Sequence, residues 1–183
     1  PDSVMLIVSP GCCGRNTSVL SSMRAYQDRF YYLLMDETDI VTGRHLKKIP
    51  KAVAEICEGL KKKPSVVMIC ITCVDALLGT DMERVCHKAE EYAGVPVRPC
   101  YMYALTREGR KPPMVHVRQS VYSLLEPKKK KGNVVNLLGY FSPLTDDCEL
   151  YDLLHGAGVK TIHEISRCKD YAQYQTMSEA NFN

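Results

Sequence analysis

Cys73 has the sequence context of a reactive or metal-binding thiol. It follows the continuous apolar run 66–71, which predicts a buried strand, and it precedes apolar residues at helical spacing up to Val85. At such a corner a thiol lies near unpaired backbone N–H groups and the positive end of a helix dipole, which favour the thiolate. We therefore predict chemistry at Cys73, because open α/β sheets bind ligands where strands pass into helices.

A second group of thiols, Cys12 and Cys13, lies between Gly11 and Gly14 after another apolar run. Glycines on both sides of a thiol pair predict a tight turn with accessible backbone amides, which suits a bulky anionic ligand such as an iron–sulfur cluster. The candidate metal ligands are therefore Cys13, Cys73 and Cys12, and the two glycines are candidate cofactor-binding residues. For Cys12, a small residue that fills the turn is an equal alternative.

These thiols must be positioned by the strands and helices around them. Apolar runs predict strands, and apolar residues at helical spacing predict a helix over 46–60. The repeated βαβ unit predicts an α/β fold, a Rossmann-like parallel sheet flanked by helices, with the start of a second α/β domain. In consecutive βα units the strand ends open on one edge, so Cys13 and Cys73 are expected to meet around one cluster. The predicted strands are 4–8, 31–35, 66–71 and 95–100.

The sequence predicts a division of the chain into two domains. A Rossmann-like cluster-binding domain is expected at 1–127 and an incomplete second α/β domain at 133–183, joined by a lysine-rich linker at 128–132. The second domain is expected to begin with a buried strand at 133–138. After one further helix and strand we expect it to end in a polar tail.

Local signals in the first domain give further expectations. We expect a helix that starts near residue 17 and ends by residue 28, after the glycine turn. The segments 36–43 and 106–113 have the composition of polar loops. The strand at 95–100 contains two prolines, which favour an edge position in the sheet.

Composition and charge limit the class of protein. The chain has 183 residues, of which 45% are apolar and 25% charged, as in an ordinary globular protein. No apolar run approaches the ~20 residues of a membrane helix, so we expect a cytoplasmic protein without a membrane partner. The net charge is +3. The lysines cluster at 61–63 and 128–131, beside Pro or Gly, which indicates solvated loop tips rather than a nucleic-acid-binding face.

The remaining cysteines have less specific interpretations. Nine cysteines, an odd number without an export signal, indicate reduced thiols rather than a disulfide framework. Cys57 and Cys86 fall on apolar helix faces and are expected to pack as small hydrophobic residues. Cys70 forms a C-x-x-C pattern with Cys73, but strand alternation directs it away from the corner. Cys100 ends a strand at the same edge, where both a ligand and a packing role remain open.

Other polar residues give weak signals. Asp36 and Asp39 are either a carboxylate pair or, as is more common, caps of a helix or loop. The five histidines have no metal-ligand spacing and are expected on the surface or in packing. The glycines around the thiol pair do not form a phosphate-binding loop, which argues against nucleotide binding. No residue is assigned a catalytic role.

Four segments, in register, resemble the component 1 family of nitrogenase and its relatives. The first segment, SPGCCG (9–14), resembles the family's His-Gly-Pro-x-Gly-Cys turn, with Cys13 at the cluster-ligand cysteine, Cys12 at a glycine and Ser9 at the histidine. The third segment, CVDALLGTD (73–81), resembles the corner where a strand of the family ends in Cys-x-x-x-Leu-Ile-Gly-x-Asp, with Cys73 at the cysteine. The resemblance covers nearly the whole chain. The segments are SPGCCG (9–14), ETDIVTG (37–43) with His45-Leu46, CVDALLGTD (73–81) and VNLLG (135–139).

The resemblance implies a subunit, or a fragment of one, of a nitrogenase-like oxidoreductase. Such a subunit relays electrons through a [4Fe–4S] or larger iron–sulfur cluster to a reducible substrate, and Cys13 and Cys73 carry over as cluster ligands. Its implied partners are a second component 1-type subunit and an ATP-dependent iron-protein reductase. The alternative within the family is a non-catalytic scaffold that carries a metal cluster or a tetrapyrrole for cofactor assembly.

Overall fold

The structure, a computed structural model, divides into two compact units, Asp2–Tyr122 and Ser123–Asn183. The proposed linker at 128–132 stays a prediction. The loop predicted at 106–113 lies almost wholly outside the described part of the chain. The described residues are 2–23, 27–101, 113–139 and 141–183.

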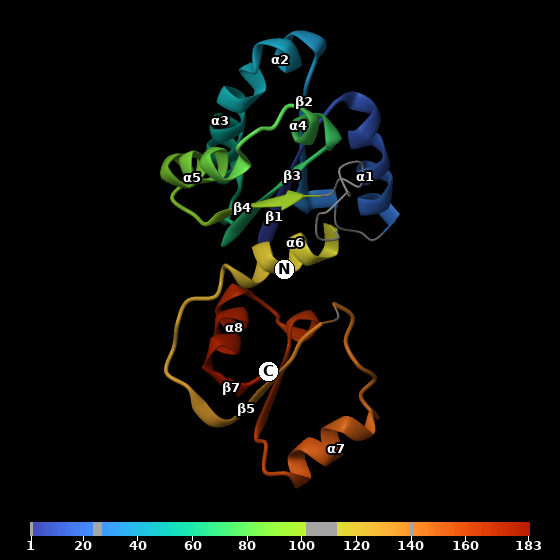
Figure 1. The fold of residues 1–183 in the computed structure, drawn as a ribbon, viewed down its shortest axis with the longest axis vertical. Helices are drawn as coiled ribbons and strands as arrows, with labels where there is room; N and C mark the ends of the chain where they lie inside the picture. Colours follow the sequence, from blue (N-terminus) through green and yellow to red (C-terminus); the bar gives the residue numbers. More distant parts are fainter. Residues whose placement is uncertain (1, 24–26, 102–112, 140) are drawn as a thin grey trace. The chain divides into compact units, whose positions relative to one another are not determined.

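A four-stranded parallel sheet forms the centre of the first unit (Figure 1). The central strands β1 and β3 carry the uninterrupted apolar runs, whose side chains are buried from both faces. The predicted parallel sheet is confirmed, and β4 lies at its edge as its prolines indicated. The spatial order is β2 (Phe30–Leu34), β1 (Ser3–Ser9), β3 (Val66–Ile71) and β4 (Val97–Tyr101).

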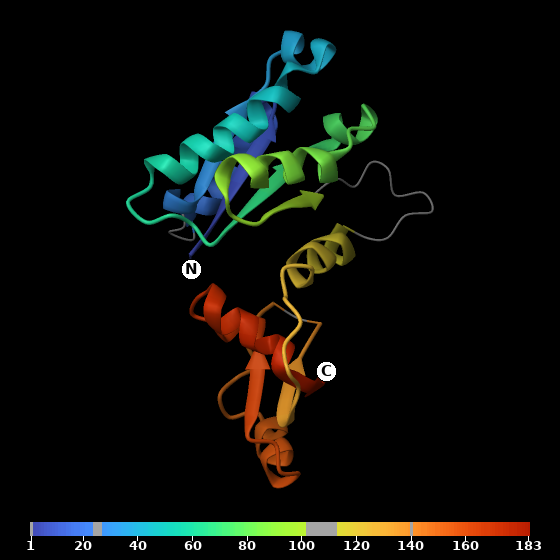
Figure 2. The ribbon, with the colours of Figure 1, turned by 90° about the vertical axis from the view of Figure 1, so that its left-hand side faces the viewer.

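Helices cover both faces of this sheet. On one face α3 (Arg44–Gly59) and α5 (Met82–Ala93) pack side by side and close the main apolar core (Figure 2). On the other face lie α1 (Gly11–Met23) and α6 (Pro113–Tyr122), which contribute contacts to Tyr32 and to a smaller core around Ile7. The result is the predicted Rossmann-like arrangement of a parallel sheet between helices.

Two expectations about the strand ends are wrong. α1 begins at Gly11 instead of residue 17, so the predicted glycine turn is the first turn of a helix. Residues 36–43 form the helix α2 (Glu37–Thr42) rather than a loop, because Asp36 caps it by accepting the backbone N–H of Asp39 at 2.6 Å. Gly43, at φ 65°, ends the helix in the left-handed conformation. The capping role that was the favoured interpretation of Asp36 is confirmed.

Gly14 allows α1 to approach the sheet closely. A Cβ atom at this position would lie 3.0 Å from Ser9 Oγ and 3.5 Å from Tyr32 Cδ1. Gly11, one helical turn earlier, has no atom within 4 Å of the corresponding position. Gly14 therefore serves helix–sheet packing, whereas Gly11 leaves bare backbone beside the thiols.

A buried histidine fixes the short helix that begins at Cys73. His45 of α3 is only 1% exposed. Its Nδ1 lies 3.0 Å from the backbone oxygen of Asp39, and its Nε2 lies 3.0 Å from Oδ1 of Asp75 in α4 (Cys73–Leu77). A carbonyl oxygen only accepts, so Nδ1 carries a hydrogen, and the Nε2 contact is attractive only with a proton between nitrogen and carboxylate. The pair ties α4 to the corner between α2 and α3.

Asp39, the acidic residue at the corner between α2 and α3, is paired with two basic side chains. The carboxylate of Asp39 is buried and accepts from Lys48 Nζ at 2.7 Å and from Arg44 Nε at 3.2 Å. The hydrogen bond from Lys48 holds the pKa of Asp39 below its usual value, although burial opposes this effect. Asp39 is therefore a structural anchor and not a member of a carboxylate pair.

The second unit contains a three-stranded parallel sheet of spatial order β6-β5-β7. Its first strand and its helix agree with the sequence predictions, but the polar tail does not. Residues 171–182 fold into a helix, a 3-10 turn and a third strand, because Tyr174, Met177 and Ala180 are buried against the sheet. The elements are β5 (Lys131–Leu137), α7 (Glu149–Gly156), β6 (Thr161–Glu164), α8 (Tyr171–Gln175) and β7 (Ala180–Phe182).

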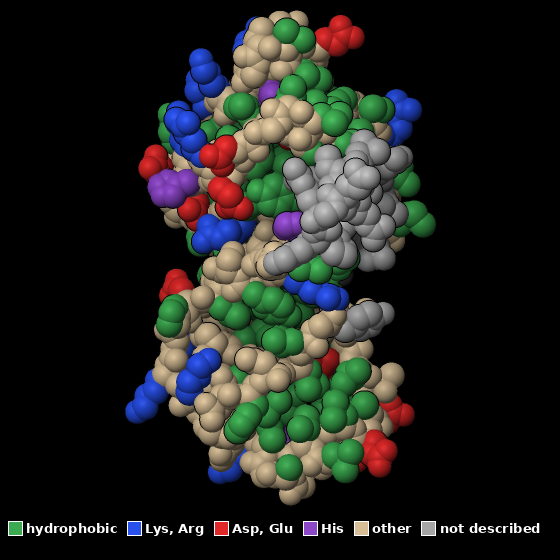
Figure 3. Space-filling view, in the orientation of Figure 1, with side chains coloured by type: hydrophobic (Ala, Val, Ile, Leu, Met, Phe, Trp, Pro, Cys, Tyr) green, Lys and Arg blue, Asp and Glu red, His purple; other side chains and the backbone are tan. Residues whose placement is uncertain are grey.

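The second unit leaves large apolar side chains uncovered. Leu153 is 63% exposed, Phe182 59% and Leu138 47%. Figure 3 shows apolar side chains gathered on the face of this unit that it displays. Contiguous apolar surface of this kind marks an interaction site in soluble proteins.

We predict that Gly14→Val destabilises the first unit, because the branched side chain would overlap Ser9 and Tyr32. The expected loss is about 1–3 kcal/mol in the free energy of unfolding, measured by urea denaturation. Gly11→Ala is the matched control and should change stability little. Equal effects of the two substitutions would contradict the close approach of α1 to the sheet.

We predict that His45→Ala destabilises the first unit by about 3–5 kcal/mol, since it leaves the buried carboxylate of Asp75 with only a long hydrogen bond of 3.4 Å from Thr80 Oγ1. His87, whose side chain is 74% exposed, supplies the control His87→Ala, for which little change is expected. The double variant His45→Leu with Asp75→Leu should recover part of the loss. A double variant less stable than His45→Ala would show that the pair is not the reason for the effect.

Candidate metal centre

The pairing of β1 with β3 brings the two candidate ligand segments to one edge of the sheet. Val8 is the register partner of Ile71, so Ser9 and Thr72 stand at neighbouring strand ends. Cys13 lies in the first turn of α1, and Cys73 is the first residue of α4. Figure 1 shows both helices starting from the same end of the sheet, at the carboxyl ends of the strands. We call the group Cys12, Cys13 and Cys73 the rim thiols.

The rim thiols interact with one another. The sulfurs of Cys12 and Cys13 are 3.9 Å apart, with Cys12 exposed and Cys13 half-buried. The pKa of Cys13 is raised, mainly by burial and then by the hydrogen bond and charge of Cys12 and by the charge of Cys73. The meeting of Cys13 and Cys73 around one cluster stays a prediction.

The raised pKa has a chemical consequence. It favours the protonated thiol of Cys13, so a metal that binds there must displace a proton. The rim thiols do not form a closed coordination shell by themselves. Among the residues that the structure describes, no three His, Cys, Asp or Glu side chains are grouped so that they could hold one metal ion. A complete site at this edge needs ligands in addition to those grouped here.

The two candidate glycines differ in their surroundings. Gly11 is exposed and open, so its backbone can face a ligand beside Cys12. Gly14 is buried against Ser9 and Tyr32, which fills the space that a ligand would need. Gly14 has a packing role, and its assignment as a cofactor-binding residue stays a prediction.

Sequence reasoning missed three buried polar groups near the rim. Ser9 Oγ, Thr72 Oγ1 and Asp75 Oδ2 have no hydrogen-bond partner within the described structure, although all three atoms are buried. Ser9 and Thr72 end the strands that carry the rim thiols, and Asp75 lies two residues after Cys73. A hydroxyl residue directly after an apolar strand is the only signal in the sequence, and it is weak. Buried polar groups without partners are rare away from functional sites.

The four other cysteines of the first unit lie away from the open part of the rim. Cys57 and Cys86 are buried in the main core, as predicted. Cys70 and Cys100 are buried together on the opposite face of the sheet, beneath α6. Strand alternation therefore predicted the direction of Cys70 correctly, and its C-x-x-C pattern with Cys73 is not a shared site.

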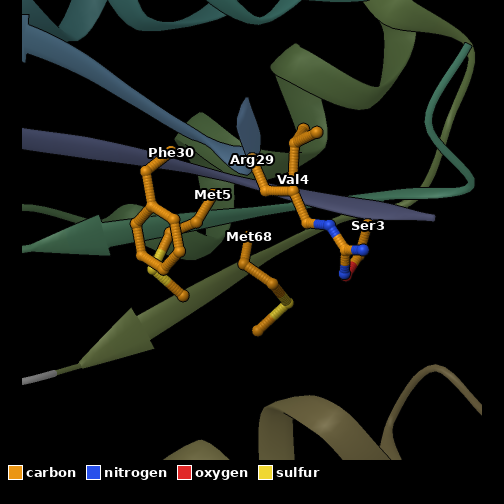
Figure 4. A pocket seen from close by; sticks show the side chains of 6 residues that line it. All are labelled: Ser3, Val4, Met5, Arg29, Phe30 and Met68. Atoms are coloured by element: carbon orange, nitrogen blue, oxygen red, sulfur yellow. The ribbon is translucent and has the colours of Figure 1, made fainter. Parts of the chain in front are cut away.

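Two hollows of the first unit lie away from the rim. One, of about 170 Å³, is lined by Met5, Phe30 and Met68 at the amino ends of the strands, opposite the rim (Figure 4). A groove of about 410 Å³ runs between the edge strand β2 and α3. No described helix is long and apolar enough to cross a membrane. On the face in Figure 3 the basic side chains are interspersed with acidic ones.

Comparisons with solved structures identify the fold. Two structures titled "Nitrogenase Cp1", at pH 6.5 and at pH 5, match with TM-scores of 0.62 and 0.65 and 19% sequence identity. They cover 90% and 96% of this chain, which spans 37% and 38% of theirs. At this identity the likeness shows the fold alone.

Comparisons of sequence extend this result. The nitrogenase iron-molybdenum cofactor biosynthesis protein NifE of Rhizobium meliloti (strain 1021) is 32% identical over 68% of this chain and 26% of its own length. NifE of Nostoc sp. (strain PCC 7120 / SAG 25.82 / UTEX 2576) is 26% identical over 100% of this chain and 39% of its own length. The chain thus spans well under half of these relatives.

The family model described as "Nitrogenase component 1 type Oxidoreductase" matches residues 1–183. The match extends through both units and confirms the resemblance seen in the four sequence segments. The chain belongs to the nitrogenase component 1 type oxidoreductase family.

Proposed function

We propose that this chain is part of a scaffold subunit that holds an iron–sulfur cluster during assembly of a nitrogenase-type metal cofactor. The observation that supports the proposal is the start of the helices that carry Cys13 and Cys73 at neighbouring ends of the parallel strands β1 and β3. The choice of a scaffold is supported by relatives that are named as cofactor biosynthesis proteins.

The donor set fits an iron–sulfur cluster shared between chains. Clusters of the [4Fe–4S] type are held by four cysteine thiolates. The rim offers Cys13 and Cys73, with Cys12 beside Cys13, but these and the other described residues do not form a group of three ligands around one ion. A second component 1-type subunit would supply the remaining thiolates. The exposed apolar surface of the second unit also favours a larger assembly.

The surroundings of the rim suit an anionic group. Gly11 leaves its backbone accessible, and the hydroxyls of Ser9 and Thr72 lack partners in the described structure. These hydroxyls would donate hydrogen bonds to thiolate or sulfide, which sets cluster potential and stability. When bound, the cluster supplies reversible one-electron storage. The residues of this chain hold it, while the His45–Asp75 pair keeps α4 in place.

An electron relay is the second candidate. The family is described as an oxidoreductase, which favours a subunit that passes electrons from an ATP-dependent iron-protein reductase to a reducible substrate. Both candidates use the same cluster ligands. In either case we propose that residues 1–127 form the cluster-binding domain and that 133–183 open a second α/β domain.

We predict that Cys13→Ser and Cys73→Ser each remove most of the iron and sulfide from anaerobically purified protein. Iron and sulfide analysis, with charge-transfer absorption near ~400 nm, measures the loss. Cys86→Ser is the control, since Cys86 is buried in the core on the other side of the sheet, and it should keep the cluster. If both rim variants keep full iron content, the ligand assignment is wrong.

Scaffold and relay differ in their response to an iron-protein reductase. A relay should be reduced only when the reductase hydrolyses ATP, and the electrons should appear in a reduced substrate. A scaffold should instead pass iron and sulfide to an apo acceptor subunit, followed by radiolabelled iron. Transfer of labelled iron without substrate reduction supports the scaffold. Substrate reduction without iron transfer would replace it by the relay.

A further inference from the structure

Two thiols outside the rim lie side by side in the sheet. Cys70 of β3 and Cys100 of β4 are register partners in a parallel pair, so both side chains project from the same face. They are 6% and 3% exposed. Two buried thiols thus lie next to each other on one face of the sheet.

Two thioethers extend this sulfur-rich face toward the amino ends of the strands. Met5 of β1 and Met68 of β3 are also register partners, and both pack against the small core that contains Cys70 and Cys100. Met68 precedes Cys70 by two residues, about 6.6 Å along the strand. Figure 4 shows Met5 and Met68 beside the hollow of about 170 Å³. The thioethers of Met5 and Met68 thus lie both beside the hollow and against the small core that holds the thiol pair.

We propose that Cys70 and Cys100 bind one Cu(I) ion between their sulfurs, with entry past the thioethers of Met5 and Met68. None of these residues is a rim thiol, so the site is additional to the cluster proposed above. Each bound ion replaces two thiol protons, which pass to solvent, and no electron is transferred. The product is a bis-thiolate complex of unchanged Cu(I).

Strand spacing favours a bridging ion over a disulfide. Metal–sulfur bonds are about 2.3 Å long, so two sulfurs on opposite sides of one ion stand about 4.6 Å apart. Neighbouring strands are about 4.7–4.9 Å apart, which nearly matches this span for parallel side chains. A disulfide needs Cβ atoms only about 3.5–4.5 Å apart, so the strands would have to converge.

Ligand number favours Cu(I) over zinc. Zinc in structural sites takes four nitrogen or sulfur ligands. The described residues contain no group of three or more His, Cys, Asp or Glu side chains suited to one ion. Thiolate and thioether ligands together select Cu(I) among the common metal ions.

The experiment measures Cu(I) binding in reduced, anaerobic protein whose rim thiols are replaced by serine (Cys12, Cys13 and Cys73). The loaded chain is titrated with bicinchoninate, a chromophoric Cu(I) chelator. We expect one Cu(I) per chain, and Cys70→Ser or Cys100→Ser should each weaken its retention at least about 100-fold. Cys86→Ser, a buried thiol in the other core, should leave the affinity unchanged.

X-ray absorption of the loaded protein provides a second test, which does not depend on the folding of the cysteine variants. Two sulfur neighbours around copper, with no nitrogen or oxygen neighbour, support the proposal. Nitrogen or oxygen ligands would overturn it. Folded Cys70→Ser and Cys100→Ser chains that retain copper with the same affinity as the parent protein would also overturn it. Loss of the proposed cluster in a rim variant has no bearing on either result.

Discussion

The in-register pairing of β1 with β3 is the contact on which the candidate site depends. Because both strands run parallel and end together, α1 and α4 start at one edge of the sheet and carry Cys13 and Cys73 there. A register shift of one residue would send alternate side chains to the opposite face and displace the thiol-bearing corners relative to each other. Both strands are buried on both faces, so their pairing lies at the centre of the core.

The two faces of the sheet differ in what they add to this edge. On the face of α3 and α5, the buried His45–Asp75 pair fixes the helix that starts at Cys73. A buried polar pair is seldom retained for stability alone, because apolar residues of similar volume often serve as well. Its use here is positional, since it holds α4 while the rim thiols stay accessible. On the face of α6, the sulfurs of Cys70 and Cys100 are enclosed in a small core.

The sequence predicted the architecture well because parallel strands buried on both faces have a distinctive apolar pattern. It also placed Cys73 correctly, since the change from a strand run to helical spacing marks the corner. It failed where local contacts decide the structure. The early start of α1 depends on packing of Gly14 against Ser9, which no local pattern records. The fold of residues 171–182 depends on burial of Met177 against a strand distant in sequence. The contact between His45 and Asp75 spans thirty positions and has no periodic signal.

The central claim is that one iron–sulfur cluster bridges the corners after β1 and β3. The most direct test is a crystal structure of anaerobically prepared protein, with its partner subunit, measured at the iron absorption edge. The account predicts anomalous iron density bonded to the sulfurs of both Cys13 and Cys73. Iron bonded to only one of them, or to neither, would contradict it.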